Sequence, residues 1–453
     1  MSNILCGQTA NHKTAFDNFR KNYNQEKFDE IFKGFSVEMQ KALPIENTKS
    51  FLTDLKNQAG NIKSGEFVGY EQKTYASFKT TFEKGVFTVN ISLDNENKIN
   101  GFFIQPFKEI ISAKNNKINL LSSFPNDIAE VIFSKTSDLP NKSQLSIAII
   151  EDGKTNYYGV IKINDSLKAI NNQNKIFEIG SLTKVFTSTV LAKLVTEKKI
   201  LLQEDINSFY PFKFNNGIKI NFISLANHTS GLPRLPDNFD LTNLINPYKD
   251  YGKDKLNEYL KSELKLENEP LKKYSYSNLG AGILGYTLGL SQKTSFQNLL
   301  QKYIFDKYSM KNSFTTSKNL NDSLIEGMNE NGEPSSNWNF DVLFGGGGIL
   351  STTEDLAKFA YAQLNEKNRE LELTRRPTFV INEKMKIGLG WHILDFENGN
   401  IVYWHNGGTG GYSSSMSVDI KQKKSVIILT NVAGINDEID ALNFELMKAL
   451  LKK

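Results

Sequence analysis

Apolar residues recur at spacings of three and four over the first sixty positions of the chain. This period predicts helix from about residue 13 to residue 58, in three pieces, of which the second ends before Pro44 and the third ends at Gly60. After Gly60 the period changes to two, and turn residues separate the apolar runs. The expected strands are 67–72, 75–82, 86–93 and 99–107. Helices followed by an antiparallel meander predict a small α+β domain.

A polar stretch rich in Asn, Ser and Lys follows this first domain and is typical of a linker. Beyond it the pattern predicts a helix at 126–134 and a hairpin of strands 145–150 and 155–163 around Asp152-Gly153. Strands are also expected near 401–404, 414–419 and 425–430. The domain boundaries that we infer are 1–109, a linker at 110–125, and 126–453.

The segment from residue 177 to residue 195 is the most distinctive part of the pattern. Its apolar residues surround nearly the whole circumference of a helix, which predicts burial on almost all sides. On this helix Ser181 and Lys184 are three residues apart and lie on one face, one turn from each other. A lysine amine that is removed from water can take the proton of a neighbouring serine hydroxyl, and the first turn of a helix favours a developing oxyanion.

Ser-x-x-Lys is a weak signal by itself. The same spacing occurs at Ser262 and Lys265, in a polar run with no apolar helix behind it. The interpretation of Ser181 and Lys184 as a catalytic pair therefore depends on two further segments.

The first of these segments contains Tyr276 and Asn278 directly before an apolar helix rich in small residues. A phenol has a pKa near 10 and becomes a useful acid or base beside a cation such as Lys184. An amide two residues further on can orient that lysine and hold a substrate carbonyl. A polar helix cap is the alternative interpretation of the same residues.

The second segment runs from a predicted strand into a glycine-rich turn and contains His405, Asn406, Gly407 and Gly408. Glycines permit close approach of a substrate to the backbone, and a strand edge offers N–H and C=O groups to an extended peptide. A single histidine in such a turn is also compatible with a purely structural role.

Ser-x-x-Lys, Tyr-x-Asn and His-x-Gly in this order resemble the penicillin-recognising serine hydrolases. The similarity is closest to the class C β-lactamase and D-alanyl-D-alanine carboxypeptidase group with its esterase and D-aminopeptidase relatives. It extends over roughly residues 130–450, and the stretches 227–233, 344–358 and 388–391 contribute to it. Among these, Ser351-x-x-Glu354 is typical of a helix-capping box, and His228 is expected to be a turn residue that holds backbone.

The resemblance implies an α+β fold of the β-lactamase/transpeptidase type, with an antiparallel sheet flanked by helices and a helical subdomain. The first domain resembles the small cone-shaped NTF2-like domain that precedes such hydrolases, and a binding or spacer role is expected for it.

The resemblance also assigns roles. Ser181 is the expected nucleophile, Lys184 its general base, and Tyr276 the group that relays the proton to the leaving group. Asn278 is expected to orient Lys184 and the acyl side of the substrate, and the N–H groups of Ser181 and Gly408 to form the oxyanion hole.

The departure from the family lies at His405 and Asn406, where classical members carry a lysine and a hydroxyl residue that bind the substrate carboxylate. An ordinary histidine is only partly cationic at neutral pH. We therefore expect an amidase, peptidase or esterase with poor β-lactamase turnover, and a fall of kcat/KM for carboxylate substrates as pH rises through the histidine titration. A catalytically weak penicillin-binding or sensory relative and an acyltransferase are the alternatives.

The resemblance implies a small-molecule or peptide substrate, for which a cell-wall-derived compound is one candidate. The net charge of +4 arises from 54 basic and 50 acidic residues that are interspersed, which does not indicate nucleic-acid binding. No run of 18 apolar residues occurs, and no metal or cofactor is expected because His, Cys and Asp lack ligand spacing. The excursion 231–251 is too long for a passive turn and is expected to border the site.

The N-terminus bears on localisation. The single cysteine, Cys6, excludes an internal disulfide, and it follows two apolar residues without a convincing lipobox. We interpret residues 1–7 as the end of a longer signal peptide, which predicts a periplasmic or secreted protein. A cytoplasmic location is the alternative.

Overall fold

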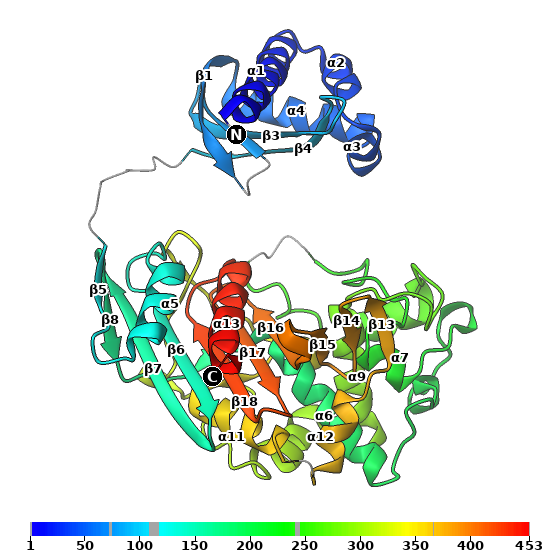
Figure 1. The fold of residues 1–453 in the computed structure, drawn as a ribbon. Coiled ribbons are helices and arrows are strands. Elements are labelled where there is room, and N and C mark those ends of the chain that lie inside the picture. Colours follow the sequence, from blue (N-terminus) through cyan, green and yellow to red (C-terminus); the bar gives the residue numbers. More distant parts are fainter. Residues whose placement is uncertain (1, 72–74, 108–116, 241–244, 366, 453) are drawn as a thin grey trace. The chain divides into compact units, whose positions relative to one another are not determined.

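The computed structural model describes residues 2–71, 75–107, 117–240, 245–365 and 367–452. These residues form two compact units, one within residues 1–114 and the other within 115–453, each with its own hydrophobic core. Figure 1 shows both units with their elements labelled.

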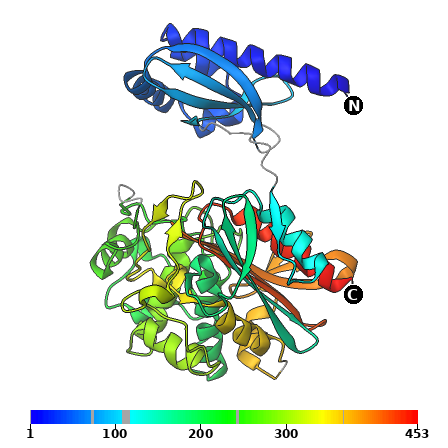
Figure 2. The same cartoon turned by 90° about the vertical axis from the view of Figure 1, so that its left-hand side faces the viewer.

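The N-terminal unit consists of four helices followed by a four-stranded antiparallel sheet in the order β1-β2-β3-β4. In its core, Phe16 of the first helix stacks on Phe78 of the sheet at 4.3 Å between ring centroids. Figure 2 shows this long helix lying against the sheet. The elements are α1 (Ser2–Asn24), α2 (Phe28–Lys33), α3 (Val37–Ala42), α4 (Ile45–Ala59), β1 (Ile62–Glu71), β2 (Tyr75–Phe82), β3 (Val86–Leu93) and β4 (Ile99–Pro106).

The pattern of the first domain predicted this order of elements. Several boundaries differ. The first helix begins at Ser2 instead of about residue 13, and β1 begins at Ile62 instead of residue 67. The first predicted piece is also two helices, which are separated where Glu26 takes a φ of 55°. A left-handed residue of this kind cannot continue an α-helix.

The second unit is built on a ten-stranded sheet in the order β13-β14-β15-β16-β17-β18-β6-β7-β8-β5. All neighbouring strands are antiparallel except β5 and β8, which are parallel. The strands are β5 (Ile118–Leu120), β6 (Gln144–Glu151), β7 (Lys154–Ile163), β8 (Ser166–Ile170), β13 (Phe379–Asn382), β14 (Met385–Ile387), β15 (His392–Asp395), β16 (Ile401–Gly408), β17 (Ser413–Asp419) and β18 (Lys424–Thr430).

Alternation along the central strands divides the core into two layers. Val426 and Ile428 of β18 pack on one face with α5 (Asn126–Thr136) and α13 (Asn436–Leu451), whereas Ile427 and Leu429 face the helices of the other layer. Figure 1 shows α13, in red, crossing the strands on the first face. The sheet is therefore buried on both faces at its centre, as the continuous apolar runs of β6 and β18 require.

The helices of the second layer surround α6 (Thr183–Thr196), whose residues 183–192 are all buried. The prediction of a helix buried on nearly all sides is confirmed. The others are α7 (Phe222–Ala226), α8 (Lys253–Glu258), α9 (Asn278–Ser291), α10 (Phe296–Leu300), α11 (Thr353–Gln363) and α12 (Arg369–Arg375), with short strands β9 (Phe177–Glu178), β10 (Gly327–Met328), β11 (Pro334–Ser335) and β12 (Leu350–Ser351).

Two local predictions differ from the structure. Residues 118–120, expected in the linker 110–125, form strand β5 and pair with β8, while residues 108–116 lie outside the described residues. The cap of α11 is Thr352, whose Oγ1 accepts from the N–H of Asp355, and the Ser351 hydroxyl instead lies 2.8 Å from that of Ser313. A β-bridge at Ser351 with Phe177 keeps this residue in a strand, so the helix starts one residue later.

None of the helices within the described ranges has the length and apolar content that a bilayer span needs.

Candidate active site

Ser181 lies at the junction between strand β9 and helix α6. Gly180, with a φ of +52°, turns the chain out of the strand into a short 3-10 turn, η1 (Gly180–Leu182), and α6 begins directly after it. A Cβ at Gly180 would stand 2.6 Å from the amide nitrogen of Gly408, so glycine is required for the backbone of β16 to approach here. Ser181 is half-buried and faces a cavity.

Lys184 is buried, with 2% of its surface exposed, and its Nζ contacts three oxygens. Nζ lies 2.8 Å from Ser181 Oγ, 2.9 Å from Asn278 Oδ1 and 2.7 Å from the carbonyl oxygen of Gly346. Burial holds the pKa of Lys184 well below its ordinary value, and the positive charge of Arg234 lowers it further.

The hydrogen-bond partners of Lys184 determine where the lone pair of its neutral amine points. A neutral amine has two N–H donors and one lone pair, and the amide oxygen of Asn278 and the carbonyl of Gly346 can only accept. Both N–H groups are therefore used by these two partners. The lone pair is left for the hydroxyl of Ser181, which is the arrangement that a general base needs.

Tyr276 lies beside this pair, two residues before the start of α9. Its ring centroid is 4.9 Å from Lys184 Nζ, and its hydroxyl forms a hydrogen bond with the side chain of Ser181. Burial raises the pKa of Tyr276 to about 12, so the phenol is protonated at neutral pH. The expectation that a cationic Lys184 would make this phenol more acidic is not met, because burial dominates the pKa of Tyr276, and the neighbouring cation that lowers this pKa is Arg234.

Asn278 is the first residue of α9, and Ser277 caps this helix by accepting the N–H of Gly280. The Asn278 side chain accepts from Lys184 through Oδ1 and donates through Nδ2 to the hydroxyl of Tyr248 at 3.0 Å. Its amide orientation is thus fixed from both ends.

Strand β16 closes the site from the sheet side. A Cβ at Gly407 would stand 2.1 Å from the carbonyl oxygen of Ile179, so the strand packs directly on the turn that carries Ser181. Asn406 donates to Asp440 of α13 at 2.5 Å, and Asn436 donates to the Gly407 carbonyl at 2.8 Å. Helix α13 therefore fixes the end of β16.

His405 differs from its expected role. Its side chain is 1% exposed and does not line the cavity, whereas its neighbours Trp404 and Asn406 do. Strand alternation explains this difference, because successive side chains point to opposite faces. Burial holds the pKa of His405 well below 6.5, so the imidazole is neutral at pH 7 and the expected histidine titration near neutral pH is wrong.

Three of the four histidines in the chain lie close together at the site, with His392 in the cavity wall and His228 and His405 behind it. His228 packs on the Tyr276 ring at 4.5 Å and accepts the N–H of Ser277 through Nδ1, which confirms its expected role in holding backbone. His392 lies 5.3 Å from His405 between ring centroids, and its Nε2 is 2.8 Å from the Tyr274 hydroxyl. Burial lowers the pKa of His392 to about 4 and that of His228 well below its ordinary value. This wall of the site is therefore uncharged.

The cavity in front of Ser181 has a volume of about 750 Å³, large enough for a small molecule or a short peptide segment. Most of the residues that line it have aromatic or amide side chains. Five of the lining residues come from the excursion 231–251, which was expected to border the site. The residues that line it are Ser181, Arg234, Leu235, Phe239, Pro247, Tyr248, Tyr274, Tyr276, Asn278, Trp338, Ile381, Met385, His392, Trp404, Asn406, Gly407, Gly408 and Asn436.

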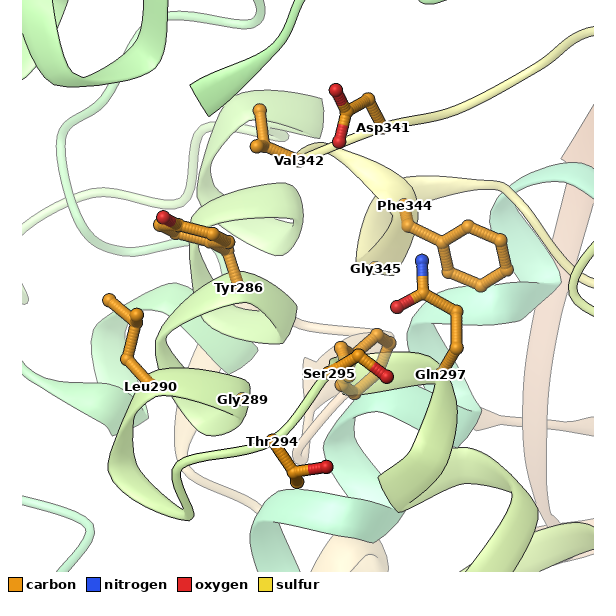
Figure 3. Close-up of a pocket in the computed structure, with 11 residues that line it drawn as sticks. Tyr286, Gly289, Leu290, Thr294, Ser295, Gln297, Asp341, Val342, Phe344 and Gly345 are labelled. Carbon is orange, nitrogen blue, oxygen red and sulfur yellow. The ribbon is translucent and has the colours of Figure 1, made fainter. Parts of the chain in front are cut away.

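A smaller cavity of about 200 Å³ lies elsewhere in the second unit, between α9, α10 and the turn at 344–346 (Figure 3). It is lined by Tyr286, Phe296 and Asp341 among others, and Figure 3 shows no serine-lysine pair in it.

The structure brings Ser181, Lys184, Tyr276, Asn278, Gly407 and Gly408 together, with Asn406 at the rim and His405 behind it. Sequence reasoning missed Arg234, Tyr248, Gly346 and His392. For Arg234 and Tyr248 a signal existed, since both lie in the excursion that was expected to border the site. Gly346 acts through its carbonyl, which no side-chain motif records.

The second Ser-x-x-Lys match is an accident of spacing. Ser262 is exposed, and Lys265 pairs with Asp237. In the part of the chain that the structure describes, no group of three or more His, Cys, Asp or Glu side chains is placed to hold a metal ion.

The fold and the comparisons together define a hydrolase related to serine β-lactamases and penicillin-binding proteins. Residues 139–450 match the sequence profile of the Beta-lactamase family, and the chain belongs to that family. Residues 17–102 match a family described as a protein of unknown function, DUF3887, which agrees with the predicted NTF2-like domain.

Relatives and solved structures agree with this assignment. The chain is 25% identical over 284 residues to a Beta-lactamase from Pseudomonas fluorescens, covering 60% of this chain and 75% of the relative. It is 26% identical over 302 residues to the D-alanyl-D-alanine-carboxypeptidase/endopeptidase AmpH from Escherichia coli, covering 60% and 77%. A β-lactamase/D-alanine carboxypeptidase from Pseudomonas syringae has the same fold, with a TM-score of 0.60, 20% identity, and coverage of 71% and 98%. The predicted β-lactamase/transpeptidase-like fold is confirmed.

Proposed function

We propose that this protein hydrolyses an amide, peptide or ester through an acyl-serine intermediate at Ser181, as a D-amino-acid peptidase, amidase or esterase. The observation that carries the proposal is the position of Lys184 Nζ, 2.8 Å from Ser181 Oγ, with its other two partners both acceptors.

In the first step Ser181 Oγ attacks the substrate carbonyl carbon while its proton passes to the lone pair of Lys184. The carbonyl oxygen becomes an oxyanion, which the N–H groups of Ser181 and Gly408 bind. One such donor lowers the barrier by about 3 kcal/mol. The Tyr276 hydroxyl then gives its proton to the leaving group and recovers one from Lys184 as the bond to the leaving group breaks.

In the second step a water molecule attacks the acyl-serine carbonyl. Its proton passes through Tyr276 and Lys184, and collapse of the intermediate returns the proton to Ser181 Oγ and releases the acid. The raised pKa of Tyr276 supports a role as proton donor, because the group is protonated before each step that needs it.

The state of His405 supports slow or absent turnover of β-lactams. A buried, neutral imidazole supplies no fixed positive charge at this position of β16, where classical members carry the lysine that binds the substrate carboxylate. The periplasmic or secreted location expected from the sequence stays a prediction.

A panel of p-nitrophenyl esters, D-amino-acid p-nitroanilides and a chromogenic cephalosporin tests this function. We expect steady-state turnover of esters or anilides, loss of at least about a thousandfold in Ser181→Ala, and little cephalosporin hydrolysis. Ser262→Ala, in the exposed second match, is the control and should keep full activity. Activity that survives in Ser181→Ala would overturn the proposal, as would one equivalent of product without turnover, which is the behaviour of a penicillin-binding relative.

A further inference from the structure

We propose that Arg234 binds an anionic group of the substrate, so that the preferred substrate carries a carboxylate or a comparable monoanion. The inference rests on the proposed function and names the substrate class for that site. Among the described residues that line the cavity, Arg234 is the one formally charged side chain, and none is acidic.

The backbone of Arg234 is anchored beside the reacting groups. Its carbonyl oxygen accepts the N–H of Asn278 at 3.0 Å and that of Leu279 at 3.1 Å, at the start of α9. The preceding residue, Pro233, accepts from the hydroxyl of Ser277 at 2.6 Å. These bonds tie the loop to the first turn of α9, which begins at Asn278, two residues after Tyr276.

The side chain of Arg234 extends over the Tyr276 ring, with the guanidinium carbon 5.3 Å from the ring centroid. The residue is exposed, and within the described residues it forms no ion pair. A guanidinium presents five N–H donors in a planar fork that matches a carboxylate, and an aromatic face below it keeps the fork in place. The fork is therefore available to a group that enters the cavity.

The other described side chains around the cavity supply no negative charge that could pair with Arg234. Tyr248 and Tyr274, which also line the cavity, have raised pKa values because of burial and carry no negative charge at neutral pH. His392 in the cavity wall and His405 behind it are neutral at pH 7, because burial lowers the pKa of each. Arg234 thus supplies a positive potential that no protein group in the cavity cancels, and a substrate anion completes the pair.

Two matched ester pairs test the inference, one with the anion on the acyl side and one on the leaving group. The acyl pair is mono-p-nitrophenyl pimelate and its methyl ester, and the leaving-group pair is 4-acetoxybenzoate and methyl 4-acetoxybenzoate. We expect the wild type to prefer the charged member of at least one pair by about tenfold in kcat/KM at low salt, with the preference reduced by 0.5 M NaCl.

Arg234→Gln should bring that ratio close to one, and Arg234→Lys should retain part of it. The ratio is the relevant quantity because the charge of Arg234 also lowers the pKa of Lys184, so its removal changes turnover of both members. Arg369→Gln is the control: Arg369 is an exposed arginine of the same unit that does not line the cavity, and its loss should keep the wild-type ratio.

A ratio near one for both pairs in the wild type, or an unchanged preference in Arg234→Gln, would overturn the inference alone. If none of the four esters is hydrolysed although the D-amino-acid p-nitroanilides are, the inference fails alone. If the anilides are not hydrolysed either, the proposed function fails as well.

Discussion

Replacement of Asn278 by aspartate tests how Lys184 is kept as a base. The substitution preserves the shape of the side chain and places a carboxylate oxygen where the amide oxygen now lies, 2.9 Å from Lys184 Nζ. At an effective dielectric constant of 20, two unit charges at this distance attract by about 6 kcal/mol. Since one pKa unit corresponds to 1.36 kcal/mol, the full effect is about four units.

Asn278 is half-buried beside an open cavity, and solvent screening reduces the shift to about two units. The carboxylate favours the ammonium form, so the pKa of Lys184 rises and deprotonation requires a higher pH. We therefore expect the acidic limb of the kcat/KM profile to move up by about two pH units in Asn278→Asp, with activity recovering on the alkaline side.

The assay is p-nitrophenyl ester hydrolysis from pH 5 to 10, corrected for the uncatalysed rate. Asn278→Ala removes the acceptor without adding charge, so it should lower the plateau without raising the limb. If the limb of Asn278→Asp coincides with that of the wild type, the titrating group is not Lys184 and the account of the base is wrong.

Three further substitutions probe the surroundings of the site. His405→Gln should keep the shape of the kcat/KM profile between pH 6.5 and 8, because burial holds the pKa of the imidazole well below 6.5; a wild-type inflection in this range that disappears in the variant would contradict this. Gly180→Ala should lower kcat at least about a hundredfold, because its Cβ would meet the Gly408 amide. Gly153→Ala is the control, since it has a φ of +72° but open space around it, and an equal loss there would show that backbone strain alone is responsible. Burial raises the pKa of Asp440 from its ordinary 3.8 to about 6, so its stabilising proton is fully bound below pH 3.8 and is lost as pH rises through 6. Between pH 4.5 and 7.5 the wild type should therefore lose about 2 kcal/mol of unfolding free energy relative to Asp440→Asn. Urea unfolding followed by tryptophan fluorescence measures this in the second unit, which holds all three tryptophans, and parallel pH curves would contradict it.

Much of the framework was predictable because it depends on continuous apolar patterns. The strands 75–82 and 86–93 were predicted to the residue, and the apolar circumference of α6 required a buried helix. The three motifs were predictable for a different reason: each lies at a junction between a strand or loop and a helix or turn, where glycine or a capping residue marks the sequence.

The remaining features depend on contacts between distant segments. His405 is neutral because it is buried next to His392, and the local sequence of neither segment predicts that the two histidines come together. Arg234 acquires its position through backbone hydrogen bonds to α9, and such bonds carry no residue preference. The carbonyl of Gly346 became a partner of Lys184 only through the packing of the glycine-rich turn.

Intact-mass spectrometry after incubation with a fluorophosphonate or a slowly released ester tests the central claim most directly. We predict one adduct per chain in the wild type, located by peptide mapping on the segment that contains Ser181, and none in Ser181→Ala. An adduct on any other residue, or an equal adduct in Ser181→Ala, would contradict the claim that Ser181 is the nucleophile.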